Sequence, residues 1–403
     1  MDQGSSKDIF DPAQRGVQHA SLRRSNERAV LTSIALAPGI SNAEVSRRTG
    51  LAPQTASAIV SQFEQTGIVR RGEVLRGRRG QPATPLFVNA AAAISIGCEI
   101  GWRHMEITLI DLGGSVIDIY RRDYLYPDAV TTVSEVSQVI GAMLGRLSPE
   151  QRSRVFSLGL ASPTEISSNI HLLGGSHDQA KLWQDMDLPL ALEDELSLPV
   201  RWFNDGNAAC WAERIGQTKP RPDNMVHLQV GTFLGAGLVA GGTLWEGPTG
   251  NSADLGAMLV SDRHGKLQYA HFIASINALE LRLKAAGITV PAANPLYWPW
   301  ASWPEVVDDW IVDAGSALAQ VIVNTTAVIE TDLATIDGGM PEAIVVRLVD
   351  ATRAALAALP PNAFALPRIA RGTLGGNAVA RGAAQLPMFQ RFFSRHNDHM
   401  DDA

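Results

Sequence analysis

Polar residues at one predicted strand–helix junction have types and spacing suited to binding a small molecule. The segment Asn204-Asp205-Gly206-Asn207 follows a predicted strand and directly precedes a predicted helix. Carboxylate and amide groups at such a junction face the crevice at the carboxyl end of a sheet, where ligands bind. The same residues would also serve a simpler purpose, because Asn and Asp cap helices. The segment therefore predicts either a ligand contact or a helix cap.

Two glycine-containing segments are further candidates. The run from Gly231 to Gly237 (GTFLGAG) would let backbone N–H groups face a phosphate or a sugar. Closely spaced glycines are also routine in hairpins, so this run alone identifies no ligand. Gly338-Gly339 lies near the start of a predicted helix, where a nucleotide could approach. Two adjacent glycines are weak evidence for that role.

Alternating strands and helices must position these segments. The first half predicts strands at residues 94–99, 105–111, 115–122, 155–160 and 199–203, with an amphipathic helix at 133–147. The second half predicts a hairpin at 225–244, helices near 305–330 and 342–358, and strands near 334–336 and 367–370. This repeated alternation of strands and helices indicates a mixed α/β body.

A different module precedes the body. Helically spaced apolar residues predict a first helix over residues 25–37, which Pro38-Gly39 ends. Ser41 and Glu44 predict a capping box for a short second helix. Gly50 supplies a turn, and a third helix is expected from Pro53 to Gly67. Three helices in this order predict a helix-turn-helix.

The third predicted helix has an apolar inner face and a small polar outer face. Gln54, Thr55 and Ser57 lie on the outer face, where they could approach base edges. Two short strands around Gly72, one of them at Val74-Leu75, predict a wing. The following strip, RGRRGQP at residues 76–82, suits a minor groove or phosphates. Further candidate DNA contacts are Arg47, Arg78, Arg79 and Gln81. The alternative is a generic helical subdomain or linker.

Charge supports the nucleic-acid hypothesis. The chain has 403 residues, which favours two or three domains, and a net charge of −7. Residues 1–90 hold 12 Lys+Arg and 7 Asp+Glu, a net of +5, and the remainder carries −12. Such an asymmetry is typical of a nucleic-acid-binding head on an acidic body.

Cysteine usage and hydropathy indicate a reducing cytoplasm and no membrane segment. Only Cys98 and Cys210 are present, which excludes a disulfide framework and a thiolate metal cluster. The first 20 residues are polar and contain no apolar signal region. The longest uncharged run, residues 224–245, contains five glycines and suits a buried hairpin better than a membrane span.

Three of these stretches resemble the ROK family of sugar-responsive repressors and sugar kinases. They are residues 40–55, 77–83 and 204–209, and the resemblance covers roughly residues 22–390. It implies a winged helix-turn-helix followed by two lobes of the actin-like, ribonuclease H-like ATPase fold, with an effector in the cleft. The expected divisions are a disordered tail (1–20), the winged helix-turn-helix (21–88) and two α/β lobes (89–205 and 206–403). The C-terminal helix could return to the first lobe.

The resemblance also implies roles for single residues. Asp205 stands where family kinases have a general base, and Asn204 where they contact the sugar. Gly231 and Thr232 resemble the phosphate-cradling hairpin. Asp254 replaces a family Glu that holds the sugar. The remaining implied ligand contacts are His271, in place of another family Glu, and Ser162.

Departures from the family pattern bear on metal and catalysis. Ala257 stands where the family has a zinc-binding His, and no cysteine follows Cys210. We therefore expect no zinc site, since a structural site needs four N/S ligands. A kinase must hold the acceptor, the base and Mg·ATP in one geometry, so the altered residues predict no kinase activity and no cofactor.

The predicted function is a transcriptional regulator, a repressor, that binds operator DNA as a dimer or tetramer and responds to a sugar or polyol. Two alternatives stay open: a sugar kinase with an added DNA-binding head, and a DNA-binding protein whose cleft has lost its ligand. The aromatic stretch from Tyr297 to Trp303 could stack on a sugar or, more commonly for such loops, pack a lobe surface.

Overall fold

The computed structural model describes residues 19–73, 84–251, 253–290, 294–360 and 364–394. They fall into two units. One contains the described residues up to Val88 together with Arg391 to Ser394, and the other spans Asn89–Gln390. Within the first unit, the backbone N–H of Ser394 donates to Oγ1 of Thr32 (2.8 Å). The last described residues therefore associate with the N-terminal helices, whereas the sequence predicted them as part of the second lobe.

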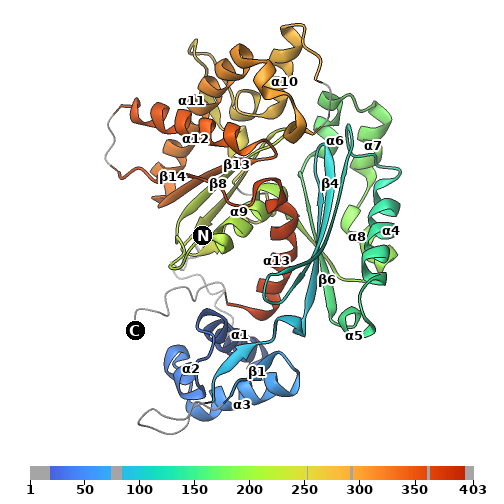
Figure 1. The fold of residues 1–403 in the computed structure, drawn as a ribbon, viewed down its shortest axis with the longest axis vertical. Helices are drawn as coiled ribbons and strands as arrows, with labels where there is room; N and C mark the ends of the chain where they lie inside the picture. Colours follow the sequence, from blue (N-terminus) through green and yellow to red (C-terminus); the bar gives the residue numbers. More distant parts are fainter. Residues whose placement is uncertain (1–18, 74–83, 252, 291–293, 361–363, 395–403) are drawn as a thin grey trace, which may run out of the picture. The chain divides into compact units, whose positions relative to one another are not determined.

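The N-terminal unit contains three helices and a two-stranded wing (Figure 1). These are α1 (His19–Leu36), α2 (Asn42–Thr49), α3 (Pro53–Gln65), β1 (Val69–Arg71) and β2 (Leu86–Val88). The first helix begins six residues earlier than predicted. β1 pairs antiparallel with β2, with Val69 opposite Val88 and Arg71 opposite Leu86. The partner strand in the wing is thus Leu86–Val88, and Val74, Leu75 and the arginine strip lie outside the described residues.

The predicted capping box is only half formed. Oγ of Ser41 accepts the backbone N–H of Glu44 (3.3 Å), as expected for an N-cap. The Glu44 carboxylate pairs with Arg48 (3.2 Å) and with Arg47 along the same helix. Charge pairing within α2 therefore replaces the reciprocal bond to the cap residue.

The first lobe of the body is built on a five-stranded sheet of order β5-β4-β3-β6-β7. Its strands are β3 (Ile94–Ile100), β4 (His104–Asp111), β5 (Val116–Asp123), β6 (Val155–Ser162) and β7 (Val200–Asn204). Its helices are η1 (Ala90–Ala92), α4 (Thr132–Gly145), α5 (Pro149–Arg152), α6 (Ile166–Asn169), η2 (Ile170–Leu173), α7 (His177–Asp185) and α8 (Leu188–Leu196). β4 runs antiparallel to β3 and β5, and β6 and β7 extend the sheet in parallel.

The second lobe has a sheet of the same design, in the order β10-β9-β8-β13-β14. Its strands are β8 (Met225–Val230), β9 (Leu234–Ala240), β10 (Thr243–Leu244), β13 (Leu333–Gly338) and β14 (Arg368–Arg371), with a separate hairpin of β11 (Leu259–Ser261) and β12 (Leu267–Tyr269). Its helices are α9 (Asp205–Gly216), η3 (Leu255–Ala257), η4 (Ala270–Phe272), α10 (Ile276–Ala285), η5 (Pro295–Tyr297), η6 (Trp300–Ser302), α11 (Pro304–Ile329), α12 (Glu342–Ala357), η7 (Gly375–Asn377) and α13 (Ala378–Phe392). Two sheets with one strand order give the actin-like, ribonuclease H-like body.

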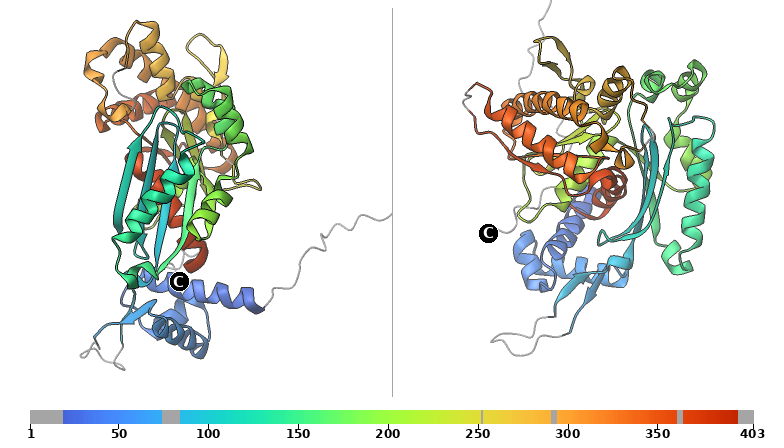
Figure 2. Two further views of the ribbon diagram at one scale, coloured as in Figure 1. Left: turned by 90° about the vertical axis from the view of Figure 1, so that its right-hand side faces the viewer. Right: turned by 45° about the horizontal axis from the view of Figure 1, so that its top comes forward.

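Successive side chains of a strand point to opposite faces of the sheet, so the two faces pack against different helices. Ile94, Ile96 and Cys98 of β3 join the core formed with α4 and α8, and α13 covers the opposite face (Figures 1 and 2). A Cβ added to Gly97 would lie 2.0 Å from the carbonyl oxygen of Ala380, and one added to Gly159 would lie 1.8 Å from that of Ala383. The last helix therefore reaches the first-lobe sheet because two strands present bare glycine.

Helix α11 is long and apolar enough to span a membrane by composition, yet it serves as a core helix of the second lobe. In its most apolar window, 61% of the residues are buried. Trp298, Trp300 and Trp303 are buried in the same core. The aromatic stretch before α11 therefore contributes mainly to packing.

Candidate functional site

The junction between β7 and α9 places Asn204 and Asp205 at the carboxyl end of the first-lobe sheet. Oδ1 of Asn204 accepts the backbone N–H of Asn207 (3.2 Å), so this residue caps α9. Its Nδ2 lies 3.3 Å from Oγ1 of Thr164 and 3.4 Å from Oδ1 of Asn251. Asn204 therefore caps α9, as one of the two predictions had it, and its amide also contacts two polar loops.

These residues border a cavity of about 180 Å³ between the ends of the two sheets. Four predicted ligand residues line it together: Asn204, Asp205, Asp254 and His271. Phe233, Leu234, Gly235 and Ala236 of the predicted run Gly231–Gly237 also line it. The rest of the wall was not predicted and comprises Trp102, Pro163, Thr164, Glu165, Asn169, Leu172, Asn251 and Phe272. Thr164 and Glu165 follow the carboxyl end of β6, so the rule that identified Asn204 could also have found them.

The pKa of the Asp205 carboxyl is shifted in this cavity. Burial raises the pKa of its carboxyl to about 6, and the negative charges of Glu99 and Asp254 act in the same direction. The backbone N–H of Gly206, which donates to Oδ1 (2.8 Å), opposes the rise. At neutral pH the group is therefore mostly ionised, and it can accept a hydrogen bond from a ligand hydroxyl.

Aromatic rings form one wall of the cavity. The ring of Trp102 meets that of Phe233 edge-on, with centroids 5.0 Å apart, and so joins the two lobes. His271 lies 4.3 Å from Phe272 and 6.1 Å from Phe233, centroid to centroid. Burial lowers the pKa of His271, although the Asp254 carboxylate acts against the shift. A neutral imidazole beside apolar rings suits a polar ligand that also has C–H faces.

Three other predicted ligand residues do not line this cavity. Ser162 is buried, and its Oγ accepts the indole N–H of Trp202 (2.8 Å). Gly231 and Thr232 form the turn between β8 and β9, and their carbonyl oxygens accept N–H groups from the start of α10 (2.9 and 3.1 Å). The N–H of Gly231 donates within the turn, to Phe233 and Gln229 (both 3.1 Å). Of the backbone N–H groups expected to face a ligand, that of Gly231 is therefore used within the turn itself.

The residues present do not fit the zinc site that the family resemblance implies. Among the described residues, no group of three or more His, Cys, Asp or Glu side chains could hold a metal. The segment from Leu255 to Phe272 contains no cysteine. Its Asp262 carboxylate instead accepts N–H groups of its own turn, from His264 (2.8 Å) and Lys266 (2.9 Å).

The helix-turn-helix presents a second candidate site. Residues Ala56, Ile59, Val60 and Phe63 of α3 are buried. Gln54, Thr55 and Ser57 are exposed on the opposite side of that helix. Arg47 pairs with Glu44, and its side chain remains 74% exposed. The other predicted DNA contacts, Arg78, Arg79 and Gln81, lie outside the described residues.

Comparison with known proteins matches both parts of the chain. The family model "ROK family" matches residues 95–388, and the model "Winged helix-turn-helix DNA-binding" matches residues 23–70. The xylose repressor of Bacillus subtilis is 24% identical over 246 residues, which is 59% of this chain and 61% of the repressor. The chain thus aligns with less than two thirds of that relative.

Two further relatives extend the comparison. A glucokinase of Halalkalibacterium halodurans is 24% identical, covering 72% of this chain and 94% of the kinase. The crystal structure of a ROK family transcriptional regulator, a homolog of the E. coli MLC protein, superimposes with a TM-score of 0.68 at 20% identity. It covers 94% of this chain and 98% of the other. With the ROK model matching most of the chain, this protein belongs to the ROK family and carries an N-terminal winged helix-turn-helix.

Proposed function

We propose that the protein is a DNA-binding transcriptional repressor whose body senses a sugar and changes operator affinity in response. The observation that carries this proposal is the polar cavity around Asn204 and Asp205 in a chain that also has a helix-turn-helix. The xylose repressors among its relatives support the same function. A regulator of this kind acts in the cytoplasm.

The cavity lining favours an uncharged sugar over a sugar phosphate. Three carboxylates, Glu165, Asp205 and Asp254, border it, and none of its described lining residues is Lys or Arg. A phosphate group would therefore meet like charge without a cation to pair with. Carboxylate and amide oxygens accept sugar hydroxyls, and the rings of Trp102 and Phe233 offer an apolar surface to sugar C–H groups.

Binding in this cavity would be coupled to DNA through the lobes. A dimer would present two α3 helices to half-sites about 34 Å apart. A sugar that binds differently to two arrangements of the lobes changes operator affinity, typically by about 1–3 kcal/mol. Fluorescence anisotropy with promoter fragments from the protein's own gene region measures this coupling with and without sugar.

A thermal-shift screen tests the sensing function directly. The full-length protein is heated with D-xylose, D-glucose, N-acetyl-D-mannosamine, inositol and the corresponding sugar phosphates. Stabilisation by a neutral sugar that Asp205→Asn abolishes supports the proposal. Stabilisation by phosphorylated sugars alone contradicts the proposed ligand class. No stabilisation by any compound favours an effector-independent DNA-binding protein.

We also propose that the body does not catalyse phosphorylation. The turn at Gly231 and Thr232, which stands where kinases cradle phosphate, is bonded to itself and to α10. The second candidate, a sugar kinase, is favoured by one observation: Asp205 keeps the position and a suitable pKa for a general base. An assay for ATP-dependent phosphorylation over the same sugars decides between them, and turnover with any sugar would refute the non-catalytic proposal.

A further inference from the structure

One short hairpin connects two residues that line the cavity. Asp254 precedes η3 and β11, and His271 follows β12 within η4. The strands pair with Leu259 opposite Tyr269, and the N–H of Ala270 donates to the carbonyl oxygen of Met258 (2.9 Å). Because each strand has only three residues, a shift of the hairpin moves both cavity residues.

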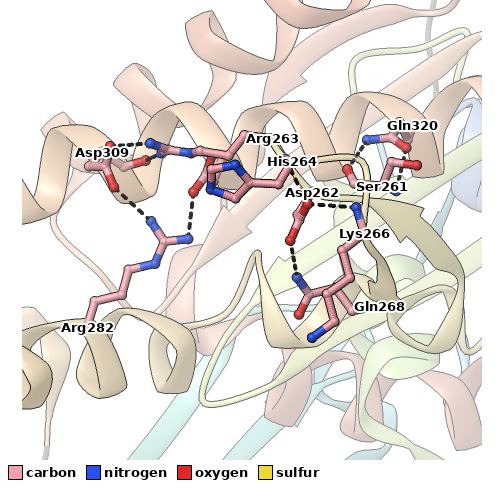
Figure 3. Close-up of polar contacts among 10 residues, drawn as sticks. Ser261, Asp262, Arg263, His264, Lys266, Gln268, Arg282, Asp309 and Gln320 are labelled. Atoms are coloured by element: carbon pink, nitrogen blue, oxygen red, sulfur yellow. Dashed lines mark hydrogen bonds and ion pairs between the residues drawn. The ribbon is translucent and has the colours of Figure 1, made fainter.

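The closed end of this hairpin is held against α11 by hydrogen bonds (Figure 3). The side chain of Gln320 acts as a strand partner for Ser261, since its Oε1 accepts the backbone N–H and its Nε2 donates to the carbonyl oxygen (both 2.9 Å). Within the turn, Oδ2 of Asp262 accepts Nε2 of Gln268 (2.9 Å). The turn is therefore ordered and has a fixed place on the helix.

An ion-pair network adds to this attachment. Nε of Arg263 lies 2.6 Å from Asp313, and its Nη1 lies 2.7 Å from Asp309. Arg282 of α10 binds the same two carboxylates, at 2.7 and 3.4 Å (Figure 3). Asp309 and Asp313 are one helical turn apart on α11, where two carboxylates would repel each other without the two guanidinium groups. The hairpin, α10 and α11 thus meet at one network of four charges.

We propose that Arg263 is a positioning residue for the effector site: through Asp309 and Asp313 it fixes the hairpin, and hence the separation of Asp254 and His271 across the cavity. This inference rests on the proposed function for its sugar-binding consequence. The residues of this segment do not fit the zinc site implied by the family, and its contacts with α11 include the ion pairs of Arg263.

Partial exposure makes this attachment sensitive to salt. The side chain of Arg263 is 40% exposed and that of Asp313 is 11% exposed, so mobile ions reach the network from one side. At about 1 M salt the screening length falls to about 3 Å, which weakens such pairs. A hairpin held by buried apolar contacts or by a metal would not respond in this way.

Hydrogen exchange on the full-length protein tests the inference without requiring a known ligand. In Arg263→Gln, the backbone N–H groups of Ala257, Met258, Ala270 and Ile273 should exchange on the order of fivefold faster. Exchange in β3 and β6 of the first lobe should not change. Arg263→Lys, which keeps the charge but not the two-pronged contact, should give an intermediate value.

Arg347→Gln is the matched control. Arg347 pairs with Asp308, so the control also removes an arginine–aspartate pair on α11, but one that reaches α12 and not the hairpin. It should leave exchange at the four N–H groups unchanged. Wild-type protein in about 1 M NaCl should approach the behaviour of Arg263→Gln, which keeps the test valid even where a variant folds poorly.

Titration with D-xylose and D-glucose links the network to the cavity. Arg263→Gln should lower the affinity for whichever sugar the wild type binds, on the order of fivefold. Arg347→Gln should leave that affinity unchanged. Unchanged exchange around Asp254 and His271, or faster exchange confined to α10 and α11, overturns the inference. A wild type that binds neither sugar counts against the proposed function and leaves the exchange result as the separate test of positioning.

Discussion

Glu99 and Glu106 lie directly opposite each other on β3 and β4, and both are buried, with 5% and 1% of their surfaces exposed. Arg121 of β5 lies 3.2 Å from Oε2 of Glu106, and Nε2 of His104 lies 3.1 Å from Oε1 of Glu99. Burial and the neighbouring Glu99 charge raise the pKa of Glu106 to about 7, against the opposing effects of Arg121 and His104. Two facing carboxylates in one sheet therefore make stability depend on pH.

Glu106→Gln should stabilise the protein in mildly alkaline solution. A folded pKa of about 7 lies above the unfolded value of 4.5, so the folded state binds this proton more tightly. The contribution of Glu106 to wild-type stability consequently falls as pH rises from about 4.5 to about 7. The variant lacks this loss and should gain about 1–3 kcal/mol at alkaline pH, with little gain near pH 5.

Urea unfolding at several pH values measures this difference. Glu150→Gln serves as the control, because Glu150 is an exposed carboxylate that pairs with Arg154. An equal gain for Glu106→Gln at acid and alkaline pH would show that volume or packing, and not ionisation, explains the change.

Asp205 should make sugar affinity depend on pH. Its carboxylate is the form that accepts a sugar hydroxyl, and its pKa is raised to about 6. Affinity should therefore be constant above about pH 7 and fall about tenfold per unit well below pH 6. In Asp205→Asn, affinity should be low and independent of pH. Calorimetric titrations provide the measurement, with Asp185→Asn, an exposed residue of α7, as the control.

The strands and helices of the body were predictable because their periodicity is local. The strand at 155–160, for example, appears as Val155–Ser162, and the helix at 133–147 as Thr132–Gly145. The partner of β1 was not predictable from its neighbourhood, because pairing with Leu86–Val88 closes a long loop across the arginine strip. Strand pairing across such a gap depends on tertiary contacts that propensity does not encode.

The residues that line the cavity were only partly predictable, because some of them meet through contacts between distant segments. Asn204 and Asp205 are marked by a strand end, and the family resemblance supplied Asp254 and His271. Trp102 lies in the connection between β3 and β4 and resembles any surface aromatic in the sequence, yet contact with Phe233 of the other lobe makes it a wall of the cavity. Ser162 also ends a strand, but its hydroxyl is taken by Trp202, a contact that the sequence does not reveal.

Gly97→Ala should destabilise the body far more than an ordinary glycine substitution. A Cβ at this position would lie 2.0 Å from the carbonyl oxygen of Ala380 and 2.6 Å from the backbone nitrogen of Ala384, so α13 would have to move. We expect a loss of roughly 3 kcal/mol or more in the free energy of unfolding. Gly141→Ala, in the exposed interior of α4 with open space around it, should instead gain about 0.5–1 kcal/mol. Similar effects of the two changes in thermal unfolding would contradict this account of the α13 contact.

The salt dependence of DNA affinity should distinguish base contacts from phosphate contacts in the N-terminal unit. Gln54 and Thr55 are exposed on α3. Gln54→Ala should therefore weaken the binding free energy for operator DNA by about 1–3 kcal/mol and leave non-specific binding unchanged. Replacing Arg78 and Arg79 by Ala should weaken binding to every sequence and reduce the slope of log K against log salt by about 2. Arg146→Ala, which removes a body arginine paired with Asp118, is the control. An unchanged slope in the double variant would show that Arg78 and Arg79 do not contact phosphates.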